Sequence, residues 1–280
     1  SSTWSLTDCA FIDNRADFGN GGAILLEESV STLTRCTFRG NRAGNGGAIL
    51  HWYNHRGSTE LTDCVFEANH ASVDGGGCLM TSNSGSPISG TMVRCNFFDN
   101  QADRDGGGIR LGARSHVTMT SCVLRRNRSG GNGGAVATTS TFSEIYPTNC
   151  LFVGNRAAGN GGGMYGSIPQ IQGTHFQSLF VGNTAGSRGG GLYVLTPGTV
   201  RNTTIAFNTA GLEAGGVYAN AYYGYWVNII LWGNSDPGGT TRDAQIRQAP
   251  PNYGVAIGNS CVQNGMTGEI SEYPHFIREP

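Results

Sequence analysis

A short pattern of small, apolar and polar positions recurs along the whole chain. The stretch from Cys36 to Leu50 reads CTFRGNRAGNGGAIL, and close versions begin at Cys9 and Cys150. In each copy a small and an apolar residue lie two positions apart before an Asn, and a Gly-Gly pair later precedes an aliphatic residue. A period of two predicts short β-strands, and no apolar period of 3.6 residues indicates a helix.

The Asn of this pattern recurs nine times, at intervals of 25 to 31 residues. Its positions are Asn14, Asn41, Asn69, Asn100, Asn127, Asn155, Asn183, Asn208 and Asn234. A regular period of this length predicts a solenoid of stacked repeats, in which each column lies about 4.8 Å from its copy in the next repeat. We expect the Asn side chains to face inward and to form a hydrogen-bonded ladder of amides.

These repeats predict an all-β fold, a right-handed parallel β-helix (solenoid) of about nine to ten rungs, where a rung is one turn of the coil. No linker or change in composition divides the chain, so we expect a single domain over residues 1–280. Regular repeats are expected over 1–234, and an irregular last rung with a C-terminal cap over 235–280. The 45 glycines, which follow no collagen period, agree with a chain rich in turns.

Six of the eight cysteines form one column, five residues before the key Asn: Cys9, Cys36, Cys64, Cys95, Cys122 and Cys150. Neighbours in this column would lie within disulfide range, but in-register parallel strands would strain the bridges. Ser178 and Thr203 continue the column, so we expect a small-residue slot filled by buried free thiols. No C-x-x-C pair indicates a metal site.

The charge of the chain limits its partners. The net charge is -1, with 18 Lys and Arg residues, all of them Arg, which argues against nucleic acid as a partner. No apolar run of 18 residues predicts a membrane-spanning segment. No signal peptide is recognisable at Ser1, so we expect a mature protein or an excised domain.

A polar column directly follows the Asn column, and alternation places it on the outside. Its members, called the basic stripe below, are Arg15, Arg42, His70, Gln101, Arg128 and Arg156. One interpretation is a solvated, hydrogen-bonding surface. The other is a groove that binds an anion or an acidic glycan.

Asp74 and Asp105 share a column on successive repeats, so their carboxylates are expected about 5 Å apart. Such a pair serves glycoside hydrolysis or binds Ca²⁺, the one cofactor we consider. With Asp103, Arg104 and Arg110 it forms the candidate catalytic group of a polysaccharide lyase or glycosidase, in which Arg clamps an acidic sugar. Because the same column elsewhere holds Asn, the competing interpretation is an Asx residue before a glycine turn.

Aromatic residues give a second set of candidate ligand-binding positions. Tyr165, Tyr193 and Tyr218 share a column that alternation places outside, where stacked rings would form a strip for sugar rings or a partner surface. The alternative is a stack covered by the C-terminal segment. Trp52 lies in a polar loop, where it either binds a ligand or packs over its neighbour.

Two tetrapeptides carry a family resemblance. Gly-Gly-Ala-Ile occurs at 21–24 and 46–49, and Phe-x-x-Asn begins at Phe11, Phe38, Phe66, Phe97, Phe152 and Phe180. These repeats resemble those of the chlamydial polymorphic outer-membrane proteins and of secreted bacterial right-handed β-helix repeat proteins more widely. The resemblance implies a bacterial protein that is secreted or on the cell surface, often an adhesin, and it carries over no catalytic residue.

Three functions remain open from the sequence. The first is an adhesive or structural rod that binds a glycan or protein surface through its lateral face. The second is a polysaccharide lyase or glycoside hydrolase, which the sequence favours less than the first. The third is a filament subunit, because the first repeat has no evident cap and rods that stack end to end would form homotypic filaments.

Overall fold

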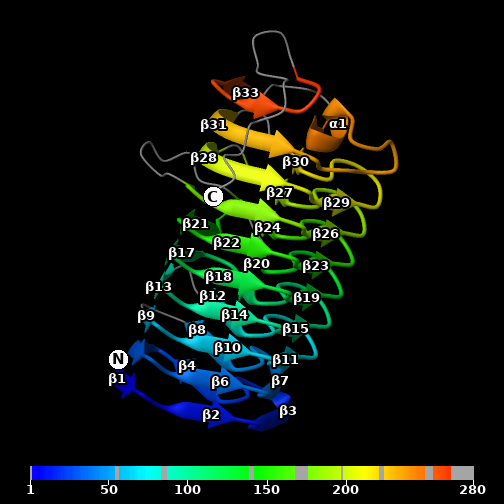
Figure 1. Ribbon diagram of the computed structural model, residues 1–280. Coiled ribbons are helices and arrows are strands. Elements are labelled where there is room, and N and C mark those ends of the chain that lie inside the picture. The colour runs from blue at the N-terminus through cyan, green and yellow to red at the C-terminus, as the bar shows by residue number, and fades with distance from the viewer. Residues whose placement is uncertain are drawn as a thin grey trace, which may run out of the picture.

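The computed structural model of the protein describes residues 2–53, 57–82, 87–138, 142–167, 176–196, 198–220, 224–249 and 255–265. Its strands coil into a rod in which four parallel sheets, here named A to D, run along the long axis (Figure 1). In the first rungs the chain passes through one strand of each sheet in turn, and each strand pairs with its counterpart in the next rung. The predicted all-β parallel solenoid is confirmed.

The four sheets differ in how many rungs they cover. Sheet A contains β1 (Ser2–Thr7), β5 (Ser29–Thr34), β9 (Gly57–Thr62), β13 (Ile88–Val93), β17 (Ser115–Thr120) and β21 (Glu144–Thr148). Sheet B contains β2 (Ala10–Ile12), β6 (Thr37–Arg39), β10 (Val65–Glu67), β14 (Asn96–Phe98), β18 (Val123–Arg125), β22 (Leu151–Val153), β25 (Leu179–Val181), β28 (Thr199–Ala206), β31 (Gly224–Trp232) and β33 (Val255–Gly258), with β34 (Cys261–Val262) also paired to β31.

Sheets C and D lie between the Asn column and the next rung. Sheet C contains β3 (Arg15–Asn20), β7 (Arg42–Asn45), β11 (His70–Ala71), β15 (Gln101–Ala102), β19 (Arg128–Ser129), β23 (Arg156–Ala157), β26 (Thr184–Ala185) and β29 (Thr209–Ala210). Sheet D contains β4 (Ile24–Glu27), β8 (Ile49–Tyr53), β12 (Cys78–Ser82), β16 (Ile109–Leu111), β20 (Val136–Thr138), β24 (Met164–Gly166), β27 (Leu192–Val194), β30 (Val217–Ala219) and β32 (Ile246–Gln248).

Left-handed backbone at the corners lets each rung turn. The first glycine of the Gly-Gly pair has positive φ, as at Gly46 (+60°), and a Cβ on the second, Gly47, would lie 2.1 Å from the carbonyl oxygen of Gly76. The pair therefore supplies both a left-handed residue and a close approach of two rungs. The corner between sheets A and B uses non-glycine residues, as at Asp63 (φ 54°) and Arg94 (φ 50°).

Stacked side chains fill the interior. The rings of Phe11, Phe38, Phe66 and Phe97 stack with centroids 4.5 to 4.9 Å apart, and Phe152 and Phe180 stack at 4.3 Å. The Asn column faces inward as a ladder of amides: Asn127, for example, accepts from the backbone N–H and Nδ2 of Asn100 at 3.1 and 3.0 Å and donates to Asn155 at 3.0 Å.

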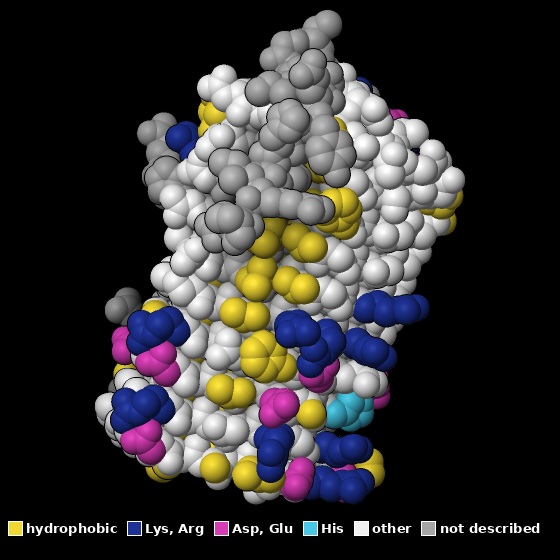
Figure 2. Space-filling view, in the orientation of Figure 1, with side chains coloured by type: hydrophobic (Ala, Val, Ile, Leu, Met, Phe, Trp, Pro, Cys, Tyr) yellow, Lys and Arg dark blue, Asp and Glu magenta, His cyan; other side chains and the backbone are white. Residues whose placement is uncertain are grey.

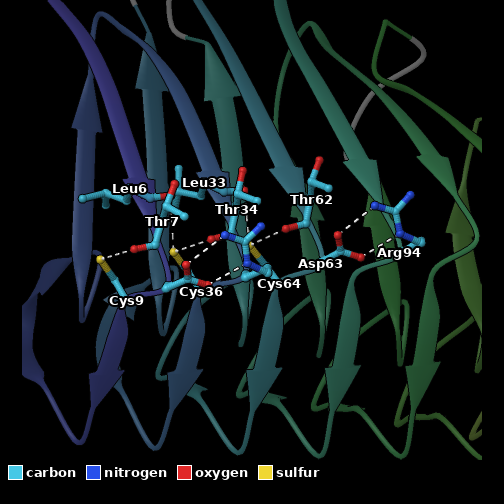
Figure 3. A network of polar contacts seen from close by, with 12 residues as sticks. Leu6, Thr7, Cys9, Leu33, Thr34, Cys36, Thr62, Asp63, Cys64 and Arg94 are labelled. Carbon is cyan, nitrogen blue, oxygen red and sulfur yellow. Dashed lines mark hydrogen bonds and ion pairs between the residues drawn. The ribbon is translucent and has the colours of Figure 1, made fainter.

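Buried thiols form a third column (Figure 3). All eight cysteines are free, and Cys36, Cys64, Cys95, Cys122 and Cys150 are buried. The thiols of the column donate to backbone carbonyls; the Cys64 thiol, for example, lies 3.4 Å from both the Leu33 and the Thr62 oxygen. Burial raises the pKa of the Cys36 thiol. The slot therefore accepts a small, weakly polar side chain, as Ser178 and Thr203 also show.

Outside the thiol column, exposed ion pairs connect neighbouring rungs at the corner between sheets A and B. Arg35 pairs with Asp8, and Arg94 pairs with Asp63 through two hydrogen bonds of 2.7 Å (Figure 3). The hydrogen bonds from Arg94 lower the pKa of Asp63. Such exposed pairs contribute little to stability, but they neutralise both arginines.

At the C-terminal end of the Asn ladder, a short helix terminates it. Helix α1 (Arg242–Gln245) begins at the N-cap Thr241, and its last residue, Gln245, is fully buried. The Gln245 side chain accepts from the Asn234 backbone N–H at 3.2 Å and from its Nδ2 at 2.9 Å. It thus takes the place that another Asn would occupy. Residues 266–280, which include the predicted end of the cap, lie outside the described residues.

Candidate functional site

The basic stripe lies along the outer face of sheet C. In-register pairing of successive strands places its six residues directly beside one another, in the order of the chain. The four arginines and Gln101 are exposed, and His70 is half-buried. Figure 2 shows dark blue arginine side chains gathered on this side of the rod around a histidine. The predicted outward orientation of the column is confirmed.

A groove opens within the stripe at its fourth to sixth positions. Its volume is about 450 Å³, and it is lined by Gln101, Ala102, Asp103, Arg128, Ser129, Gly130, Arg156 and Ala158. Strands β15, β19 and β23 and the turns that follow them supply these residues. Gly130 allows two rungs to approach closely at the groove, because a Cβ there would lie 2.2 Å from the Asp103 carbonyl oxygen.

Two arginines face this groove without an ion pair. Among the described residues, no carboxylate lies within ion-pair distance of Arg128 or Arg156. Their Cα atoms are register partners, so two positive charges lie side by side on neighbouring strands. Like charges in that arrangement destabilise a sheet. An anion placed between them would remove this repulsion and accept hydrogen bonds from both.

Asp99, a carboxylate on which Arg128 acts through space, is already engaged. Asp99 accepts hydrogen bonds of 2.7 and 2.6 Å from Nε and Nη2 of Arg126. Those bonds, with the charges of Arg126, Arg125 and Arg128, lower the pKa of Asp99. Arg128 therefore feels Asp99 through space but shares it with a closer partner.

Among the described residues, Asp103 is the one carboxylate that lines the groove. Its Oδ1 accepts from His70 Nε2 at 2.9 Å and from Gln101 Nε2 at 3.4 Å. Asp103 therefore does not join the predicted catalytic group, and it faces the basic stripe instead. Arg104, the next residue, is exposed and makes no ion pair within the described part of the chain.

The remaining predicted catalytic residues do come together, at the turn between sheets C and D. Arg110 is 4% exposed, with its Nε 3.7 Å from Asp74 Oδ2 and its Nη2 3.5 Å from Asp105 Oδ2. Burial lowers the pKa of the guanidinium, and the charges of Asp74 and Asp105 oppose that shift. The Nε of Arg110 is buried without a hydrogen-bond partner.

The two aspartates also have a structural task. Asp74 Oδ1 accepts from the backbone N–H of Asp105 at 3.0 Å, and Asp105 Oδ1 accepts from that of Asn132 at 2.7 Å. Asn132 accepts from Asn160 in the same way, at 2.9 Å. This second ladder agrees with the Asx interpretation of the column. It occupies one oxygen of each carboxylate and leaves the other for Arg110.

No group of three or more His, Cys, Asp or Glu residues is placed to hold a metal ion in the described ranges. Between Asp74 and Asp105 the positive charge comes from Arg110. A Ca²⁺ ion would have to displace that guanidinium or repel it. Binding of Ca²⁺ by this chain stays a prediction.

The three tyrosines stack as expected but are less open than expected. Ring centroids are 5.0 Å apart between Tyr165 and Tyr193 and 5.1 Å between Tyr193 and Tyr218. Tyr193 and Tyr218 are only 9% and 7% exposed, since they pack in an apolar cluster with Ala214 and Leu195. The prediction of an exposed aromatic strip is therefore wrong for these two rings, because neighbouring segments cover the faces of the stacked column.

Arg188 contacts the end of this stack, with its guanidinium 5.2 Å from the centroid of Tyr218. Trp52 lies on β8 and is half-buried, and its indole Nε1 is buried without a hydrogen-bond partner. Residues 54–56 of the Trp52 loop lie outside the described residues. A ligand-binding role for Trp52, Tyr165, Tyr193 and Tyr218 stays a prediction.

Comparison with known proteins identifies the architecture. No described helix is long and apolar enough to cross a membrane. Neither the curated proteins nor the solved structures contain a match to this chain. A family model described as "Right handed beta helix region" matches residues 1–176, more than half of the chain, which agrees with the predicted handedness. With its parallel sheets, stacked phenylalanines and asparagine ladder, the protein belongs to the right-handed beta helix family.

Proposed function

We propose that this protein is a rod-shaped binding module that holds an anionic glycan along the basic stripe of sheet C. The observation that carries the proposal is the pair of in-register arginines, Arg128 and Arg156, which have no ion pair within the described residues and lie at the side of a groove of about 450 Å³. The family and the rod shape support a lateral binding surface but do not identify its ligand. The resemblance to bacterial surface repeats supports a secreted or cell-surface location.

The chemistry of the stripe suits carboxylated or sulfated sugars. Arginine presents several N–H donors in a planar fork and pairs with an oxyanion through two parallel hydrogen bonds. Strands about 4.8 Å apart repeat this fork along the rod, so an extended polymer can contact more than one rung. Gln101 adds a neutral amide that can bond to sugar hydroxyls.

Calorimetry with polygalacturonate and neutral dextran tests the proposal. We expect the chain to bind polygalacturonate and not dextran, and the affinity to fall between 50 and 500 mM NaCl because the Debye length shortens from about 14 to 4 Å. Arg128→Ala combined with Arg156→Ala should weaken binding at least tenfold, since two charge-assisted contacts are lost. No binding of any anionic glycan by the wild-type chain would refute the proposal.

Arg35→Ala combined with Arg94→Ala is the matched control. It removes the same number of exposed arginines, but each is neutralised by an aspartate at the corner between sheets A and B. Its affinity should stay within twofold of the wild type. Equal loss in both double variants would mean that net charge, and not the groove, governs binding.

A second candidate function is cleavage of an acidic glycan at Asp74, Asp105 and Arg110. The buried Arg110 Nε–H, which has no hydrogen-bond partner among the described residues, favours it, because an unpaired N–H can donate to a substrate oxygen. A screen for new reducing ends and unsaturated products, with and without calcium, tests this function. Product that survives Asp105→Asn would exclude this cluster as the catalytic group.

End-to-end stacking into filaments is less well supported. Asn14 is exposed at the first rung, but the last Asn of the ladder, Asn234, is already bonded by Gln245. A second copy would therefore find no free amide at that end of the ladder. Light scattering that gives a constant monomer mass from micromolar to near-millimolar concentration is expected.

A further inference from the structure

We propose that Asp103 is the specificity-determining residue of this groove: it selects sugars that combine a carboxylate with free hydroxyls and rejects densely charged polyanions. The inference rests on the proposed glycan binding and names the class of glycan. It also accounts for the presence of a carboxylate in a groove that otherwise presents positive charge.

The position of Asp103 is fixed on one side only. Its Oδ1 is held by His70 Nε2 and Gln101 Nε2, at 2.9 and 3.4 Å. No hydrogen bond within the described residues reaches Oδ2, and the side chain is 48% exposed. One carboxylate oxygen is therefore oriented by the protein, while the other is open to a donor in the groove.

The backbone holds Asp103 against the arginine side of the groove. The Asp103 N–H donates to the Ala71 oxygen at 2.9 Å, and the Gly130 N–H donates to the Ala102 oxygen at 3.0 Å. Because Gly130 has no Cβ, its backbone comes close to the Asp103 carbonyl oxygen, and both residues line the groove together with Arg128 and Arg156. The groove thus presents an acceptor and two cationic donors across an open gap.

A uronic acid matches this arrangement. Its carboxylate would accept hydrogen bonds from Arg128 and Arg156, and a hydroxyl of the same or the next sugar would donate to Asp103 Oδ2. A polymer with several sulfates on each sugar offers few hydroxyls and would place an anion against Asp103. Repulsion at that contact lowers its affinity even though the arginines attract it.

Asp103→Asn tests the inference, because it keeps the shape and an Oδ1 acceptor for His70 but replaces the open acceptor with an N–H₂ donor. Binding of the full chain to polygalacturonate and to dextran sulfate is measured by calorimetry at pH 7 and low salt. We expect the variant to bind dextran sulfate about tenfold more tightly, the size of one favourable charge contact. Its affinity for polygalacturonate should fall severalfold. The two affinities thus change in opposite directions, and their ratio shifts in favour of dextran sulfate.

Asp63→Asn is the control for net charge. It raises the charge by the same unit, at the corner between sheets A and B, and it should leave the ratio within twofold of the wild type. An unchanged ratio in Asp103→Asn, with binding of both polymers intact, overturns the role of Asp103 and leaves the glycan proposal standing. Absence of binding to either polymer in both the wild type and the variant overturns both proposals.

Discussion

Replacing one asparagine in the middle of the ladder is expected to destabilise the rod far more than replacing the first. The Asn127 side chain makes four hydrogen bonds and is fully buried. Asn127→Ala leaves the Asn100 backbone N–H without its acceptor and removes the amide donor of the Phe97 carbonyl at 2.9 Å. The Asn100 Nδ2 keeps its bond to Phe66, and the Asn155 Oδ1 keeps the backbone N–H of residue 127.

The magnitude follows from this count of orphaned groups. The unsatisfied Asn100 N–H costs about 1–3 kcal/mol, and loss of the amide bond to the Phe97 carbonyl, which stays in the ladder of sheet B, costs about 0.5–1.5 kcal/mol, so the two give roughly 1.5–4.5 kcal/mol. Asn127→Asp is expected to cost at least as much at neutral pH, because it keeps the acceptor but buries a charge against the Phe97 carbonyl and Asn155 Oδ1. Asn14→Ala removes one partly buried bond of 2.8 Å to Asn41 and should cost about 0.5–1 kcal/mol.

Urea unfolding followed by far-ultraviolet circular dichroism measures these changes as shifts of the midpoint. Repeat arrays can lose two-state behaviour, so the slope of the transition is compared among the three variants and the wild type. The reasoning would be refuted if Asn127→Ala shifted the midpoint no more than Asn14→Ala. That result would mean that water or a local rearrangement satisfies the orphaned groups in the middle of the rod.

Three further predictions concern other buried features. Burial lowers the pKa of His51 from 6.5 to about 4, so the free energy of unfolding should fall by about 3 kcal/mol as pH falls from 6.5 to 4. Urea titrations at several pH values measure this loss, which should disappear in His51→Gln. Gly47→Ala should destabilise the rod by more than about 3 kcal/mol because its Cβ would clash with backbone, whereas Gly182→Ala, with open space around it, should cost about 1 kcal/mol. A thiol reagent should label only the partly exposed cysteines, Cys9 and Cys261, until urea unfolds the chain, and early labelling of the other six would contradict the buried column.

Much of the architecture could be predicted because each rung repeats the same pattern of small, apolar and polar residues. A period of about 28 residues and alternation alone predict that three columns face the interior: Asn127 with its counterparts, the thiols and the phenylalanines. A column in a parallel solenoid must stack on itself, since the strands are in register. The sequence therefore predicted the parallel sheets, the inward ladder and the outward orientation of the basic stripe.

Relations between columns were harder to predict. Asp103 and Asp105 are two residues apart in sequence, yet one faces the groove with His70 and the other faces Arg110 at the next corner. Gln245 carries no signal, because it lies 11 residues after Asn234, outside the period of the repeat, and reaches the ladder from a short helix.

The sequence by itself thus determined what lies inside and outside each rung. Only the tertiary structure decided which outward groups are neutralised and which stay free: Arg94 pairs with Asp63, while Arg128 and Arg156 have no carboxylate within ion-pair distance among the residues that the structure describes. It likewise decided that Tyr193 and Tyr218 are covered. The physical reason is that burial along a column follows from a repeat of period two. Pairing across corners depends on turn length and on segments that the period does not describe.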